Sequence, residues 1–359
     1  MQLHAAHSFV LLLHHRRRLC VLLSFQHNTN DKNVAGKQSM NCIEICAGAG
    51  GQALGLEQAG FAASVLIEID HHACSTLRLN RPTWNIQQQD IRTFSAKNYH
   101  GIELLAGGVP CPPFSMAGKQ LGAADERDLF PEAIRLIDEA RPMAVMLENV
   151  RGFLNTGFAM YRATLKKQLS DLGYQSAIRL LQASDYTVSQ SRQRVVIVAI
   201  QSEYSEHFSW PTPYFSPPPS VGRLLFDLMA ANHWPLAEQW MHQAATIAPT
   251  IVGGSKKHGG PDLGPTRAKQ AWAQLGVDGR GIADVAPQPD FVGIPRLTTR
   301  MVARLQGFPD TWQFAGRKTA AYRQIGNAFP PPVASAVARQ IRACIRASRR
   351  IFTAVEVPV

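Results

Sequence analysis

The 359-residue sequence has few of the features that mark secreted, zinc-binding or membrane-spanning proteins. Its six cysteines form no CxxC pair and are too sparse for a disulfide framework, so we expect reduced thiols, a cytoplasmic location and no metal site. The apolar runs FVLLL and LCVLLSF near the N-terminus are far shorter than the roughly 18 residues that cross a bilayer. We therefore expect no membrane span, and no internal repeat is evident.

Acidic residues are scarce relative to basic ones, with 26 Asp and Glu against 37 Lys and Arg and a formal net charge of +11. This balance favours a polyanionic partner, nucleic acid first, although the charges in HHRRR and IRASRR could belong to solvated tails. An apolar fraction of 45% is ample for one large domain or two unequal ones. Because the first expected strand follows Met40, we interpret residues 1–39 as a disordered or non-native extension.

Short apolar runs alternate with stretches of helical periodicity between residues 42 and 200, which is typical of a parallel sheet covered by helices on both faces. The expected fold is therefore α/β, Rossmann-like, with a mostly parallel doubly wound sheet. The region 203–294 is rich in Pro, Gly and Trp without long periodicity, which predicts a smaller irregular unit. The five runs are CIEICA (42–47), SVLIEID (64–70), GIELLAGG (101–108), MAVMLENV (143–150) and VVIVAI (195–200).

A glycine-rich stretch, EICAGAGGQALG, follows the first run. Gly48, Gly50 and Gly51 lie where a strand turns into a helix, so the backbone can approach a ligand at the helix N-terminus. Glu68 comes 20 residues after Gly48, where an acid accepts hydrogen bonds from ribose hydroxyls, and Asp90 could bind an adenine amino group. The motif alone does not separate a nicotinamide cofactor from S-adenosylmethionine.

One cysteine, Cys111, stands in the stretch GGVPCPPFS at the carboxyl edge of the expected sheet. A buried inert thiol is the commoner fate of a lone cysteine. The prolines around it, Pro110, Pro112 and Pro113, disfavour a packed strand and restrict the backbone, which would hold the cysteine side chain in one direction. We therefore interpret Cys111 as a nucleophile.

Three charged residues lie near later strands. Glu148 ends the run MAVMLENV and would lie next to Cys111 if the two strands are neighbours. In QSRQR, Arg192 and Arg194 precede and enter the last run, and strand alternation places both on one side. Each residue alone would be an ordinary surface charge.

Taken in order, these stretches resemble the DNA cytosine-5 methyltransferase family of bacterial modification methylases, and the resemblance runs from about Asn41 to about Ile341. The motifs that carry it are AGAGG, GGVPCPPFS, LENV, QSRQR, RLTTRMVARLQGFPDTW and AYRQIGNAFPPPVASAVARQI.

The resemblance implies a Cys111 thiolate that attacks carbon 6 of a flipped-out cytosine, so that carbon 5 takes a methyl group from S-adenosylmethionine. It implies that Glu148 hydrogen-bonds N3 and the exocyclic amine, that Arg194 binds O2 and that Arg192 braces the pocket. It also assigns further residues to the methyl donor's site: Cys46, Gly48, Gly50, Gly51, Glu68, Asp90, Pro110 and Asn327. Two departures are Pro112, where Gln is common, and Cys46, where an aromatic is common.

The same resemblance implies double-stranded DNA as the partner. SMAGKQLGAADERD (115–128) would close over the flipped base, and the irregular unit would read the sequence. The expected divisions are residues 40–202 for catalysis and cofactor binding, 203–318 for target recognition and hinge, 319–348 for the return to the first domain, and 349–359 as a tail. The expected DNA contacts are Ser115, Lys119, Arg127, Lys256, Lys257, His258 and Arg267.

Three alternatives remain open from the sequence: a tRNA cytosine-5 methyltransferase, a nicotinamide oxidoreductase, and an inactive DNA-binding module. The oxidoreductase leaves VPCPPFS, ENV and QSRQR unexplained, and the inactive module is disfavoured because no catalytic group is missing. We expect a monomer associated with the bacterial nucleoid, working beside a cognate restriction endonuclease.

Overall fold

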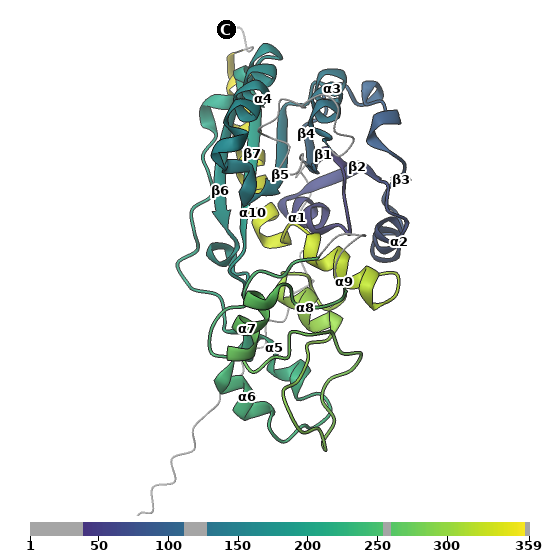
Figure 1. Cartoon of the computed structure of the whole chain (residues 1–359). Coiled ribbons are helices and arrows are strands. Elements are labelled where there is room, and N and C mark those ends of the chain that lie inside the picture. The colour runs from purple at the N-terminus through teal and green to yellow at the C-terminus, as the bar shows by residue number, and fades with distance from the viewer. Residues whose placement is uncertain (1–38, 111–127, 254–259, 356–359) are drawn as a thin grey trace, which may run out of the picture. The chain divides into compact units, whose positions relative to one another are not determined.

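The computed structural model describes residues 39–110, 128–253 and 260–355, and from Ser39 onward the chain forms one compact unit. Its centre is a seven-stranded sheet in the order β3-β2-β1-β4-β5-β7-β6 (Figure 1). The first strand begins at Met40, two residues before the run 42–47 that the sequence predicted as the first strand. The strands are β1 (Met40–Ile45), β2 (Phe61–Glu68), β3 (Ile86–Gln88), β4 (Leu104–Gly108), β5 (Ala144–Val150), β6 (Tyr174–Gln182) and β7 (Gln193–Gln201).

The sheet is mixed. The four pairs from β3 to β5 are parallel, and β7 runs antiparallel to both β5 and β6. The mostly parallel, doubly wound sheet is therefore confirmed, with an antiparallel edge. Strand order reverses between β1 and β4, and parallel sheets bind ligands at the carboxyl ends of the strands at such a point. Gly108 pairs with Glu148, so the strand that leads to Cys111 and the strand that carries Glu148 are neighbours, which is the condition on which their expected proximity depended.

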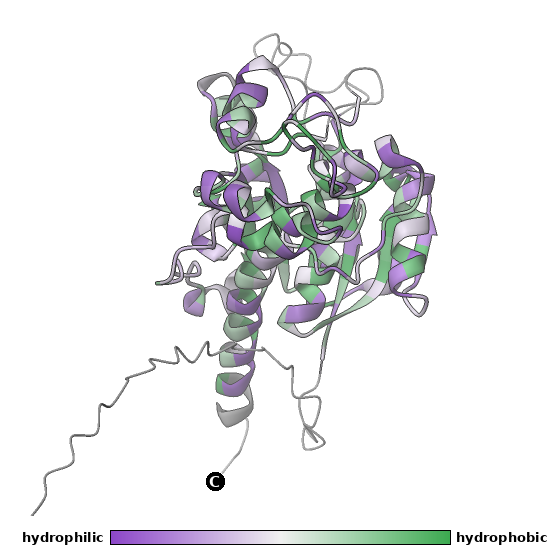
Figure 2. Ribbon diagram, turned by 90° about the horizontal axis from the view of Figure 1, so that it is seen from below, coloured by the Kyte–Doolittle hydropathy of each residue, from purple (hydrophilic) through white to green (hydrophobic). Residues whose placement is uncertain are grey.

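Both faces of the sheet are buried, which explains why the strands are almost continuously apolar. Val195 and Ile197 point to a core shared with α3 (Phe130–Ala140) and α4 (Ala159–Asp171). Val196 and Val198 point to the opposite core, shared with α1 (Gly51–Ala59) and α10 (Pro331–Val355). Figure 2 shows apolar and polar residues mixed along the long helix that leads to the C-terminus, as its position on the edge of a core requires.

The remaining helices continue the chain beyond the sheet. α2 (His71–Asn80) follows β2, and Asp70 caps its N-terminus by accepting hydrogen bonds from the His72 and Ala73 amides. In Figure 1, α5 to α8 lie together away from the strands, and α9 leads back toward α1. Their bounds are α5 (Val221–Met229), α6 (Ala237–Gln243), α7 (Thr266–Gln274), α8 (Thr299–Leu305) and α9 (Lys318–Asn327).

A third core joins the helices α5 to α9 to the glycine-rich end of the sheet. Trp240, Trp272 and Trp312 lie in it together with Ala53 and Leu77 from the first part of the chain. Among the residues that the structure describes, no helix is both long and apolar enough to cross a membrane.

Candidate active site

A cavity of about 540 Å³ opens at the carboxyl edge of the sheet, where the strand order reverses. Its wall combines the glycine-rich turn after β1, the start of α2, the end of β4, Glu148 from β5 and the last turn of α9. Seven of the eight residues that the sequence assigned to the methyl donor line this cavity or an adjoining one of about 300 Å³: Cys46, Gly48, Gly51, Glu68, Asp90, Pro110 and Asn327.

The glycine-rich turn needs left-handed backbone at alternate positions. Gly48 has φ 56° and Gly50 has φ 85°, which glycine adopts without steric cost. Cys46 adopts φ 52° although it has a side chain. Gly50 does not line either cavity; an added Cβ there would lie 2.7 Å from Leu77 and 2.8 Å from Trp312. We therefore assign Gly50 to the close packing of the turn.

Glu68 is fixed by the backbone on either side of it. Its two carboxylate oxygens accept hydrogen bonds of 2.7 Å from the amides of Gly48 and Asp70. Burial nevertheless raises the pKa of Glu68, against the effect of these hydrogen bonds. The next residue, Ile69, is 63% exposed and lines both cavities, an apolar surface that the sequence argument missed. Its position directly after Glu68, the acid at the end of the second apolar run, is the sequence signal that could have identified it.

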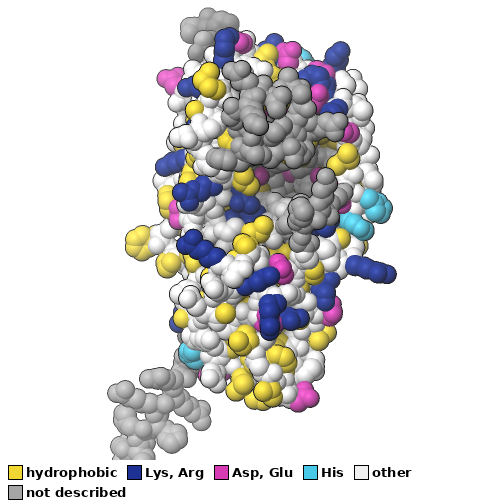
Figure 3. Space-filling view, viewed as in Figure 1, with side chains coloured by type: hydrophobic (Ala, Val, Ile, Leu, Met, Phe, Trp, Pro, Cys, Tyr) yellow, Lys and Arg dark blue, Asp and Glu magenta, His cyan; other side chains and the backbone are white. Residues whose placement is uncertain are grey.

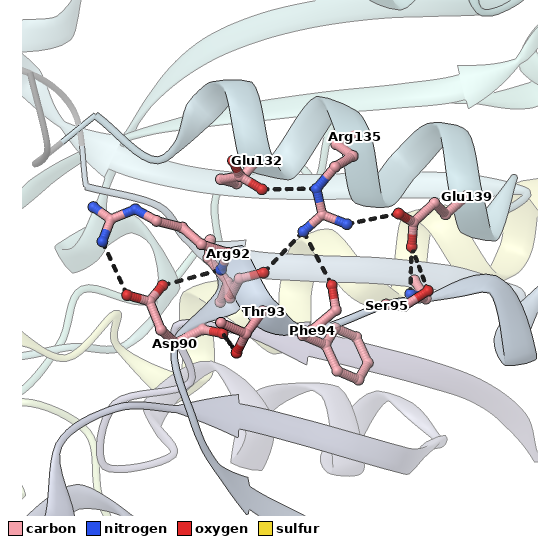
Figure 4. A network of polar contacts seen from close by, with 10 residues as sticks. Asp90, Arg92, Thr93, Phe94, Ser95, Glu132, Arg135 and Glu139 are labelled. Atoms are coloured by element: carbon pink, nitrogen blue, oxygen red, sulfur yellow. Dashed lines mark hydrogen bonds and ion pairs between the residues drawn. The ribbon is translucent and has the colours of Figure 1, made fainter. Parts of the chain in front are cut away.

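Asp90 lines the smaller cavity at the start of a 3-10 turn, Ile91–Thr93. Its carboxylate accepts from the Arg92 amide and pairs with the Arg92 guanidinium at 2.9 Å. Arg135 of α3 binds this turn at both ends, because it donates to the carbonyls of Ile91 and Phe94 at 2.9 and 3.0 Å (Figure 4).

Arg135 is itself oriented by two carboxylates of α3. Its Nε donates to Glu132 at 2.7 Å and its Nη1 to Glu139 at 2.6 Å. Glu139 also accepts from the Ser95 hydroxyl and the Ala96 amide, so the chain after the turn is tied to the same helix (Figure 4). α3 therefore sets the position of the loop that carries Asp90.

Glu44 of β1 is the most unusual residue of the cavity wall. It is 1% exposed, and neither carboxylate oxygen makes a well-formed hydrogen bond among the described residues. Burial raises its pKa well above the usual range and the nearby Glu68 adds to the shift, while the Ala53 backbone amide acts weakly in the opposite direction. Gln52 of α1 also lines the cavity, and its side-chain oxygen is buried and unpaired. Buried polar groups normally find partners, so these oxygens mark a place for a donor or cation from outside the chain.

Glu148 and Arg194 form a buried ion pair at the sheet edge, with 2.7 Å between Oε1 and Nε. Their side chains are 11% and 12% exposed. Burial raises the pKa of Glu148, while Arg194 and then Arg192 act in the opposite direction. Glu148 therefore keeps a proton more readily than an exposed glutamate does, although a guanidinium is in contact with it.

Arg192 points elsewhere. Its guanidinium is fully buried and donates to the carbonyls of Ile251, Gly326 and Ala328 at 2.6, 2.8 and 2.9 Å. Burial lowers its pKa well below the usual value. The two arginines that sequence alternation placed on one side thus make different contacts: Arg194 pairs with Glu148, and Arg192 binds three carbonyls from two other backbone segments.

Cys111 itself lies outside the described residues, as do Ser115, Lys119, Arg127, Lys256, Lys257 and His258. The chain on either side of residues 111–127 is anchored. Asn149 donates to the Val109 carbonyl at 2.9 Å, and the Leu129 amide donates to the Pro110 carbonyl at 3.3 Å. Pro110, the residue before Cys111, lines both cavities. Arg267 is exposed on α7 and does not line the cavity.

Known proteins resemble this chain over most of its length. The family model for C-5 cytosine-specific DNA methylase matches residues 40–343. Type II methyltransferase M.NaeI of Lentzea aerocolonigenes is 56% identical over 314 residues, which cover 86% of this chain and 76% of that protein. Type II methyltransferase M.NgoMIV of Neisseria gonorrhoeae is 57% identical over 302 residues, which cover 83% of this chain and 96% of that protein.

Solved structures show the same fold at lower identity. Spodoptera frugiperda DNMT2 matches with a TM-score of 0.61 at 18% identity, covering 85% of this chain and all of that one. Entamoeba histolytica methyltransferase EhMeth matches with a TM-score of 0.58 at 15% identity, covering 86% of this chain and 99% of that one. The family resemblance that the sequence motifs indicated is confirmed: this chain belongs to the C-5 cytosine-specific DNA methylase family.

Proposed function

We propose that the chain methylates carbon 5 of a flipped-out cytosine in a specific duplex DNA sequence, with Cys111 as the nucleophile. The observation that carries this proposal is the ion pair between Glu148 of β5 and Arg194 of β7. Glu148 lines the cavity of about 540 Å³, which we call the donor cavity, and β5 pairs with β4, the strand that leads to Cys111. A carboxyl with a raised pKa and a fixed guanidinium form the polar edge that a cytosine ring requires.

The cavity fits S-adenosylmethionine by the chemistry of its walls. Glu68 would accept from the ribose hydroxyls, Ile69 would cover the adenine face, and Asp90 would lie at the adenine amino group. The unpaired side-chain oxygens of Glu44 and Gln52 would accept hydrogen bonds from the ammonium group of S-adenosylmethionine. This cation would supply the hydrogen-bond donors that these buried oxygens otherwise lack. When bound, S-adenosylmethionine supplies an electrophilic methyl group.

The chain's own residues prepare the cytosine. The Cys111 thiolate adds to carbon 6, and the electron pair of the 5,6 double bond moves toward carbon 5 and the N3–C4 edge. Glu148 holds a proton at N3, which relieves the negative charge that develops there, and Arg194 donates to O2. After the methyl group has been accepted, a base or water removes the proton from carbon 5, and the electron pair expels Cys111.

DNA binding is supported by charge. Lys and Arg side chains are spread over the face shown in Figure 3, and the chain carries a net charge of +11. We assign target recognition to residues 203–318 and phosphate contacts to Lys119, Arg127, Lys256, Lys257 and Arg267, with Ser115 and His258 beside them. We further propose that the protein acts as a monomer in the cytoplasm, at the bacterial nucleoid. A cognate restriction endonuclease is proposed as its partner enzyme because M.NaeI and M.NgoMIV are named type II methyltransferases.

The test is covalent trapping on a substrate that cannot lose its carbon 5 substituent. Methylation-sensitive sequencing of a host that expresses the protein first identifies the target sequence. Duplex DNA with 5-fluorocytosine at that target should then form a denaturation-resistant adduct in the presence of S-adenosylmethionine, and Cys111→Ser should form none. Equal behaviour of the two proteins would refute Cys111 as the nucleophile. Methylation of a tRNA cytosine in place of duplex DNA would support the RNA alternative.

A further inference from the structure

The last turn of α9 touches a backbone segment that the proposed division assigns to target recognition. Gly326 and Gly253 meet directly: a Cβ added to Gly326 would lie 2.4 Å from both Cα and N of Gly253. A Cβ added to Gly253 would lie 2.4 Å from Oδ1 of Asn327 and 2.6 Å from the Arg323 carbonyl. Real Cβ contacts are essentially never shorter than 3.0 Å, so neither position admits a side chain without a shift.

The contact lies on the wall of the donor cavity. Arg323 and Asn327 both line it, together with the following residues of the chain. Gly253 thus packs next to Asn327, which forms part of the cavity wall. A displacement of the segment at Gly253 toward Asn327 would move Asn327 relative to the rest of the cavity, because the two lie so close that an added Cβ does not fit between them.

Arg192 holds the two sides of this contact together. One guanidinium nitrogen donates to Ile251 in the recognition segment, and the other donates to Gly326 and Ala328 at the end of α9. Gln190 adds an indirect connection: its side-chain oxygen accepts from the Ile251 amide at 2.9 Å, its nitrogen donates to Gln306, and Gln306 donates to the Ala328 carbonyl at 2.7 Å. A fully buried guanidinium is costly unless its donors are used, and both terminal nitrogens of Arg192 donate to carbonyls, although its Nε has no partner among the described residues.

We infer that Gly253 and Gly326 are positioning residues that make the recognition segment 250–253 a structural part of the donor site. The absence of a side chain at both positions lets the recognition backbone support Asn327, and binding in the donor cavity in turn orders that backbone. The inference rests on the proposed use of this cavity for S-adenosylmethionine. It goes beyond that use because it connects donor binding with a segment that lines no part of the cavity.

Two alanine variants test the inference with the full chain in the absence of DNA. S-adenosylhomocysteine is titrated by calorimetry into the wild type, Gly253→Ala, Gly326→Ala and the control Gly260→Ala. The control is matched because nothing lies within 4 Å of a Cβ added to Gly260. We expect Gly253→Ala and Gly326→Ala to bind at least tenfold more weakly and Gly260→Ala to bind as the wild type does. Helix propensity alone favours alanine over glycine at position 326, so weaker binding there reports the contact.

Hydrogen exchange of the wild type keeps the inference testable if an alanine variant does not fold. S-adenosylhomocysteine should slow exchange in a peptide that contains residues 248–253, because the amides of Ala248 and Ile251 are donors in this segment. Folded alanine variants with wild-type affinity, or unchanged exchange in this peptide, would overturn the inference. A wild type that binds no S-adenosylhomocysteine would instead refute the proposed donor site.

Discussion

Glu44→Gln tests two effects of the buried Glu44 carboxyl separately: its contribution to binding of the methyl donor and its contribution to the free energy of unfolding. Its two oxygens are buried without a well-formed hydrogen bond among the described residues, and the residue lines the donor cavity. A hydrogen bond to a charged group contributes about 1.5–3 kcal/mol, so loss of the Glu44 contact to an ammonium group should weaken S-adenosylhomocysteine binding about 10- to 150-fold. Glutamine preserves the shape of the side chain, which limits the packing change.

The same substitution should change the pH dependence of unfolding. Because the pKa of Glu44 is raised in the folded state, the folded protein holds this proton at pH values where the unfolded chain has lost it. The contribution of this group to stability is fully present below the ordinary value of 4.5 and is lost as the pH rises toward the raised pKa. The stability of Glu44→Gln relative to the wild type should therefore grow by up to about 1.4 kcal/mol per pH unit across that window.

Chemical denaturation at several pH values measures the stability difference, and calorimetry measures the affinity. The expected combination is a variant that is more stable near neutral pH and binds S-adenosylhomocysteine more weakly. The control is Glu238→Gln, at an exposed site outside the cavity, which should bind as the wild type does. A Glu44→Gln variant with wild-type affinity and a stability difference that does not vary with pH would refute the reasoning.

Two further substitutions test the scaffold of the site. Arg135→Lys keeps the charge, but lysine cannot bridge two carbonyls and two carboxylates. Calorimetry should therefore show that 5′-methylthioadenosine and S-adenosylhomocysteine both bind about tenfold more weakly to this variant, a loss of about 1.4 kcal/mol. Glu44→Gln, by contrast, should weaken the binding of S-adenosylhomocysteine only. Tyr161→Phe removes a hydroxyl that lies 2.7 Å from both oxygens of buried Asp128, and should lower the free energy of unfolding by about 1.5–3 kcal/mol in urea denaturation. Unchanged affinities or stability would contradict these assignments.

Local sequence signals predicted residues that the structure brings together around the two cavities. Glycines at a strand-to-helix turn, an acid at the next strand end and the Glu-Asn-Val motif each depend on short-range backbone geometry, which spacing along the chain reveals. The parallel part of the sheet followed from the apolar runs for the same reason. The edge strand β6 was not among the expected runs, because only two of its nine residues are fully buried and it lacks a continuous apolar pattern.

The partners of buried polar groups were decided by the tertiary structure. Arg192 and Arg194 look alike in QSRQR, yet one meets a carboxylate and the other meets carbonyls 59, 134 and 136 residues away. Glu44 looks like any acid in a strand until the surrounding helices leave its oxygens without a donor. Gly253 and Gly326 are ordinary glycines in sequence, and only the return of α9 brings their backbones into contact.

The sequence by itself determined which chemical groups are present and which strand ends carry them, because those features are local. Tertiary structure decided which of these groups are paired, unpaired or in contact, because burial and long-range packing set the cost of every polar atom.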